Sequence, residues 1–228
     1  MADFNDNYSL LIQKLDHFIR KYYTNQILRG VLYSSGVVLG LFLTVNFLEY
    51  NFYFHTTVRK LIFFTFLLGS LAAIGNWIVV PAMHYFRLGR IIDHEQAAQI
   101  IGSHFTDVKD KLLNILQLKK QSFNAVDTAL INASINQKSE EIKPVPFKAA
   151  IDFKQNKKYL KYALPPLLLL LGVLVFDSSI IRDSTYRLIN NNQEFVKPAP
   201  FSFVLKTPNL KVGQNEDYNL QVTTQGSI

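Results

Sequence analysis

The sequence predicts a helical membrane protein that leads into the start of an Ig-like β-sandwich. Three observations support this fold class: three apolar stretches, a concentration of Lys and Arg between the second and the third, and an alternating pattern near the C-terminus. Hydrophobic residues make up 49% of the 228 residues and charged residues only 18%, which is too apolar for an ordinary soluble domain. The lack of cysteine excludes disulfides and thiol catalysis.

Residues 1–29 are predicted to form an amphipathic helix on the cytoplasmic side of the membrane. Four apolar residues recur at the spacing of one helical face: Leu11, Leu15, Phe18 and Tyr22. Basic residues interleave with this stripe, a pattern typical of a helix that lies in the membrane interface. We expect it to lead directly into the first span.

Residues 30–86 are predicted to form a transmembrane hairpin. Its spans, at about 30–48 and 61–82, lie within uncharged runs of 19 and 26 residues. The third uncharged run, 162–176, has 15 residues and is shorter than a bilayer core needs at about 1.5 Å per residue. We still expect a third span over 159–181, because leucines fill it and 178–181 extend it. A buried helix of a soluble domain is the alternative.

The basic residues orient the predicted spans. Residues 81–161 carry 13 Lys and Arg, against 2 in the hairpin connection 49–60 and 5 in 177–228. The positive-inside rule therefore places the N-terminus and the 87–158 segment in the cytoplasm, and 182–228 in the periplasm. Because the net charge of +7 is concentrated at one membrane face, we do not expect nucleic-acid binding.

Residues 87–158 are predicted to form a small helical insert. Apolar residues recur there at helical spacing until the Lys-Pro-Val-Pro break at 143–146. An insert of this size holds only a marginal core by itself. We therefore expect it to dock on the membrane helices or on a partner.

Small residues and lysines supply the candidate contact residues. The helix-packing candidates are Gly36, Gly40, Gly69 and Ala73, which are small residues four apart within the spans. The candidates for contact with anionic lipid are Lys154, Lys157, Lys158 and Lys161, which share one face of an α-helix. A positive-inside anchor without lipid specificity is the alternative for the lysines.

Residues 182–228 are predicted to begin a β-sandwich. Phe201, Phe203 and Leu205 recur with the period of a strand, and Tyr218 and Val222 belong to a second such pattern. Two or three strands are marginal as an isolated sheet. We therefore expect the polypeptide to continue past residue 228. Completion of a partner's sheet by these strands is the alternative.

Four stretches resemble large envelope proteins of Bacteroidota that contain a domain of unknown function. They are LIQKLDHFIRKYY at 11–23, EQAAQIIG at 95–102, DKLLNIL at 110–116 and FVKPAPF at 195–201. The resemblance spans nearly the whole chain and implies an inner-membrane protein with N-terminal spans and a long periplasmic part. It implies no catalytic or binding residues.

The sequence predicts no catalytic residue, no cofactor and no metal site. His84, His94 and His104 are ten residues apart and do not share a helical face, and no phosphate-binding or nucleophile motif is present. No ionisable residue lies inside a span away from its ends, unlike in most ion carriers.

We therefore predict a structural or assembly anchor of the inner membrane rather than an enzyme. Its expected partners are membrane lipid and other envelope proteins on the cytoplasmic and periplasmic sides, with self-association also expected and no small-molecule substrate. The alternatives are an enzyme whose active site lies beyond residue 228 and a transporter or channel component.

Overall fold

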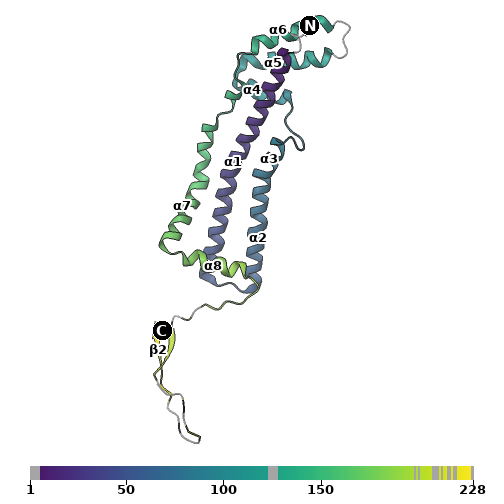
Figure 1. Ribbon diagram of the computed structural model, residues 1–228. Helices are drawn as coiled ribbons and strands as arrows, with labels where there is room; N and C mark the ends of the chain where they lie inside the picture. Colours follow the sequence, from purple (N-terminus) through teal and green to yellow (C-terminus); the bar gives the residue numbers. More distant parts are fainter. Residues whose placement is uncertain are drawn as a thin grey trace.

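The computed structural model describes residues 6–122, 128–197, 199, 201–206, 211, 213, 214, 217 and 220–226. Its longest element is α1, Asp6–Phe52, a single helix of 47 residues that runs the length of the helical part of the molecule (Figure 1). At about 1.5 Å per residue this helix is about 70 Å long. The amphipathic helix and the first span predicted from the sequence are thus two halves of one element.

Two other helical segments lie beside α1 (Figure 1). On one side, α2 (Thr56–Ile74), the π-helical turn η2 (Gly75–Val79) and α3 (Val80–Tyr85) run antiparallel to α1 as one rod. On the other side lies α7, Leu160–Phe176. The helix α1, the α2–α3 rod and α7 each belong to a helical segment that is long and apolar enough to cross a membrane. This confirms the prediction of three segments with the length and composition of membrane spans.

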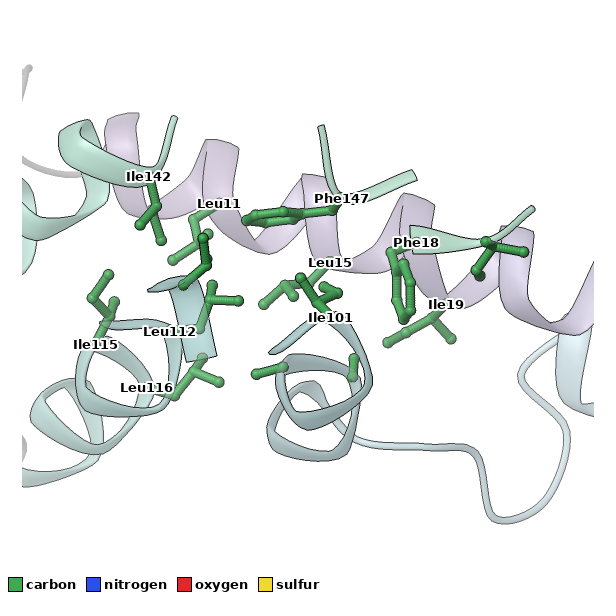
Figure 2. Close-up of a cluster of buried hydrophobic side chains, with 14 of the residues drawn as sticks. Leu11, Leu15, Phe18, Ile19, Ile101, Leu112, Ile115, Leu116, Ile142 and Phe147 are labelled. Carbon is green, nitrogen blue, oxygen red and sulfur yellow. The ribbon is translucent and has the colours of Figure 1, made fainter. Parts of the chain in front are cut away.

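The helical head domain surrounds the N-terminal half of α1. It contains α4 (His94–His104), α5 (Thr106–Ser122), α6 (Thr128–Ile142) and the short 3₁₀ helix η3 (Phe147–Ala150). Figure 2 shows its core, in which side chains of α1 meet those of the other head elements. The buried residues labelled there are Leu11, Leu15, Phe18, Ile19, Ile101, Leu112, Ile115, Leu116, Ile142 and Phe147.

The apolar stripe of α1 therefore faces protein in the head domain, whereas its sequence pattern predicted a position in the membrane interface. Leu15 and Phe18 are completely buried, as are Ile101 on α4 and Leu112 on α5. The physical reason is that α4 and α5 carry apolar stripes of their own, and the three stripes cover one another. The insert gains a sufficient core by using the N-terminal half of α1.

The helix of the third predicted span, α7, ends at Phe176, whereas the sequence predicted that the span extends to residue 181. Asp177 leaves the helical conformation, and its carboxylate accepts a hydrogen bond of 3.0 Å from the backbone N–H of Ser179. A new helix, α8 (Ser179–Ile189), begins there and packs across the ends of α1 and α2 (Figure 1). An aspartate that binds the amide two residues ahead offers the chain a turn in place of another helical residue.

Two antiparallel strands form a hairpin beyond α8. β1, Phe201–Leu205, confirms the first predicted strand and pairs with β2, Val222–Gly226, with Phe203 opposite Thr224. Tyr218, which was predicted to belong to the second strand, lies outside the described residues. Within the described part of the chain this hairpin packs on no helix (Figure 1). The Ig-like sandwich stays a prediction.

A buried charge cluster as candidate functional site

At the end of the bundle opposite the head domain, one carboxylate is buried beneath two arginines. Glu49 of α1 is 0% exposed and Arg59 of α2 is 1% exposed. Arg59 Nε donates to Glu49 Oε1 at 2.9 Å, and Nε of Arg187 in α8 donates to the same oxygen at 3.2 Å. These three residues, which we call the Glu49 cluster, join three helices that are far apart in the sequence.

The two terminal nitrogens of Arg59 bind backbone carbonyl groups. Arg59 Nη1 donates to the carbonyl of Gln193 at 2.8 Å, and Nη2 donates to that of Phe54 at 2.6 Å. The guanidinium carbon of Arg187 lies 4.2 Å from the centroid of the Tyr53 ring. Tyr53 has a left-handed backbone conformation, φ 49°, directly after the last residue of α1. The turn that ends α1 therefore also places an aromatic face beside Arg187.

A neutral polar contact extends the cluster along the α1–α8 interface. Asn46 lies one helical turn before Glu49 and is 0% exposed. The hydroxyls of Ser184 and Thr185 on α8 both donate to Asn46 Oδ1 at 2.7 Å, and Asn46 Nδ2 donates to the carbonyl of Phe42 at 2.8 Å. Hydrogen bonding across this interface sets the register of α8 on α1 because buried polar groups need matched partners.

The Glu49 cluster also holds the segment that leaves the bundle toward the β-hairpin. The Arg59 guanidinium lies 5.0 Å from the centroid of the Phe195 ring, and His55 Nε2 lies 3.3 Å from Glu194 Oε1. Together with the bond to the Gln193 carbonyl, these contacts attach residues 193–195 to the α1–α2 connection. The direction in which the chain leaves the bundle is therefore set by Arg59.

The chemistry of the Glu49 cluster is that of a structural connection. Two cations share one anion, and Glu49 Oε2 is buried without a hydrogen-bond partner. A buried ion pair of this kind adds little net stability, but removal of one partner leaves an uncompensated charge and is strongly destabilising. Among the residues that the structure describes, no group of three or more His, Asp and Glu side chains is placed to hold a metal ion.

Sequence reasoning missed this cluster because its members sit at the ends of spans. Glu49 served only as the boundary of the first uncharged run, Arg59 was counted only among the basic residues of the hairpin connection, and Arg187 was assigned to the segment after the third span. One feature of the sequence could have indicated the contact between Glu49 and Arg59. These two residues of opposite charge stand at the two ends of a short connection between helices, which brings their side chains close together. Nothing local in the sequence indicates Arg187, because its position depends on where α8 packs.

The four predicted helix-packing residues differ in their surroundings. A Cβ atom on Gly36 would lie 2.6 Å from the carbonyl oxygen of Tyr162 in α7, so this glycine permits a close helix contact. A Cβ atom on Gly40 would have no neighbouring atom within 4 Å. A Cβ atom on Gly69 would have only one, a side-chain carbon of Leu41 at 3.7 Å. Ala73 is half-buried in α2. The structure therefore brings Gly36 against another helix and leaves Gly40 without a close neighbour.

A further close contact, at Gly30, was not anticipated from the sequence. A Cβ atom there would lie 1.7 Å from the carbonyl oxygen of Trp77. Both carbonyls that approach a glycine of α1 lie four residues before a proline: Trp77 before Pro81 and Tyr162 before Pro166. Because proline has no N–H, neither carbonyl receives the usual helical hydrogen bond from that position. Glycine is the residue that lets another backbone approach such a site.

The four predicted lipid-contact lysines are exposed, but they do not share one α-helical face. Lys154, Lys157 and Lys158 lie in the 3₁₀ helix η4, Phe153–Tyr159, and Lys161 lies in α7. With three residues per turn, Lys154 and Lys157 lie on one side of η4 and Lys158 on the next. The tighter helix forms where the Asp152 carboxylate accepts from the N–H of Lys154 at 2.8 Å.

Comparison of the chain with protein-family models, with curated proteins and with solved structures finds no match.

Proposed function

We propose that this chain is a structural anchor of the bacterial inner membrane that connects partners at the cytoplasmic face with partners in the periplasm. The observation that supports it is the continuity of α1, which carries Leu15 and Phe18 of the head core at one end and Glu49 at the other. One rigid helix thus connects both soluble parts of the chain. The absence of predicted catalytic motifs agrees with a structural role.

The proposed orientation has the head domain in the cytoplasm and the β-hairpin in the periplasm. Its support is the charge distribution, with 13 basic residues in 81–161 against 5 in 177–228. The resemblance to Bacteroidota envelope proteins leads to the same expectation. Within this proposal the strands belong to a periplasmic β-sandwich, and the partners are other envelope proteins or further copies of this chain.

Cysteine labelling tests this orientation. The chain has no native cysteine, so Asn51→Cys, Gln137→Cys and Lys206→Cys each introduce a single thiol. A membrane-impermeant thiol reagent added to intact spheroplasts should label positions 51 and 206 within minutes. It should label position 137 only after lysis, which also serves as the control for accessibility. Labelling of position 137 in intact spheroplasts would reverse the proposed topology.

Loss of distinct partners in two variants tests the anchor function. Leu130 on α6 is 74% exposed, and Leu130→Glu should release proteins bound to the head domain. Removal of residues 199–228 should release a different set and leave the head partners bound. Affinity purification in mild detergent with mass spectrometry measures both sets, and Gln137→Glu on α6 is the control for an added charge. If the wild-type chain purifies alone as a monomer, the anchor function is wrong.

A further inference from the structure

Four aromatic rings gather where the spans approach the head domain. Tyr33 of α1 lies at their centre, with ring-centroid distances of 5.8 Å to Trp77, 5.0 Å to Tyr159 and 5.5 Å to Tyr162. The rings come from all three membrane-spanning segments. Trp and Tyr are enriched at the depth of the lipid headgroups, because their rings are apolar and carry one polar group. This ring cluster therefore indicates the level of the membrane surface in the structure.

Three cations lie at the same level as the ring cluster. The guanidinium carbon of Arg29 lies 5.7 Å from the centroid of Tyr159, and Lys158 Nζ lies 5.2 Å from it. Lys161 Nζ lies 5.0 Å from the ring of Tyr162. Arg29 is oriented by its Nε, which donates to Asn156 Oδ1 at 3.3 Å. Three positive charges are thus held beside aromatic faces at one edge of the bundle.

These cations lack acidic partners among the described residues. The ion pairs formed there include neither Lys158 nor Lys161 nor Arg29. Below them, α7 exposes an apolar surface in which Leu164, Leu168 and Leu171 are half exposed. Positive charge, aromatic rings and aliphatic side chains thus follow one another along α7. A phospholipid presents its phosphate, glycerol region and acyl chains in the same order.

We propose that Arg29, Lys158 and Lys161, together with the ring cluster, bind the phosphate headgroup of an anionic phospholipid whose acyl chains lie along α7. An anionic lipid fits better than a zwitterionic one because these three cations form no ion pair among the described residues. Each lysine near a membrane surface raises the affinity for anionic lipid about fivefold. The site is independent of the Glu49 cluster, which lies at the other end of the bundle.

The single tryptophan of the chain makes this site directly measurable. Trp77 is the only tryptophan and lies in the ring cluster. The full chain is reconstituted in bilayers in which either phosphatidylglycerol or phosphatidylcholine carries brominated acyl chains, which quench tryptophan on contact. Comparison of the two quenching curves gives the relative affinity for the anionic lipid. For the wild type we expect a preference for phosphatidylglycerol of at least about fivefold.

Paired variants identify the residues responsible. Lys158→Gln with Lys161→Gln should remove most of that preference, whereas Lys60→Gln with Arg182→Gln, two exposed cations at the other end of the bundle, should leave it unchanged. Inorganic phosphate, compared with chloride at equal ionic strength, should not compete, which distinguishes a lipid site from a phosphate site. Equal quenching by both lipids in the wild type would overturn the proposal. So would a preference that persists in the Lys158 and Lys161 variant with an unchanged Trp77 emission spectrum.

Discussion

Glu49→Gln is expected to lower the free energy of unfolding of the helical bundle by about 3–5 kcal/mol, the usual cost of breaking a buried ion pair. The reason is that Arg59 and Arg187 are both buried and share Glu49 Oε1 as their only carboxylate contact among the described residues. A neutral amide keeps the shape of the side chain but leaves two positive charges together in a desolvated interface. The measurement is unfolding in mixed micelles with increasing denaturing detergent, followed by circular dichroism.

The matched control for this variant is Glu194→Gln. Glu194 also contacts a basic residue of the hairpin connection, His55, but its side chain is 75% exposed, so the same chemical change should alter stability by less than about 1 kcal/mol. Equal stability of Glu49→Gln and wild type would show that the two arginines do not depend on this carboxylate.

A triple variant separates charge compensation from packing. Glu49→Leu combined with Arg59→Met and Arg187→Met removes all three charges and keeps similar side-chain volumes. Apolar replacements of complete buried ion networks are often neutral or stabilising, so most of the stability lost in Glu49→Gln should return. The contacts of Arg59 with residues 193–195 would still be lost. Faster hydrogen exchange confined to that segment would therefore assign Arg59 the role of directing the chain out of the bundle.

Gly30→Ala is expected to destabilise the packing of α1 against the α2–α3 rod by about 1–3 kcal/mol, the usual cost of overpacking. The added methyl would lie 1.7 Å from the Trp77 carbonyl oxygen, so one of the two backbones must move. Trp77 emission should shift together with the loss of stability because the tryptophan is in the displaced turn.

Gly40→Ala on the same helix is the control for this substitution. Its methyl meets no atom within 4 Å, and alanine is favoured over glycine in a helix by up to about 1 kcal/mol. We therefore expect Gly40→Ala to be neutral or slightly stabilising. Equal destabilisation of both variants would contradict the assignment of Gly30 as a close-contact position.

Local patterns along the chain were sufficient to predict the number and order of the helical segments that are long and apolar enough to cross a membrane. Runs without charge locate these segments, and a connection between Glu49 and Lys60 follows from the two uncharged runs on either side. The start of α4 is also local, because the side chain of Asp93 accepts from the N–H of Gln96 three residues ahead, as part of a capping box. The strand β1 follows in the same way from its alternating residues. These features depend on neighbours within a few residues.

Other features depend on contacts between distant parts of the chain. The stripe containing Leu15 and Phe18 suits a lipid interface and a protein core equally well, because a hydrophobic period determines which face is apolar and not what covers it. The end of α7 at Asp177 and the placement of α8 bring Arg187 to Glu49 across 138 residues. Gly30 and Gly40 cannot be told apart by their sequence pattern. Only Gly30 lies against a backbone carbonyl, that of Trp77, which receives no hydrogen bond from Pro81 because proline has no N–H. Such pairings need the three-dimensional packing of the helices, since their energy comes from groups that meet only after the chain has folded.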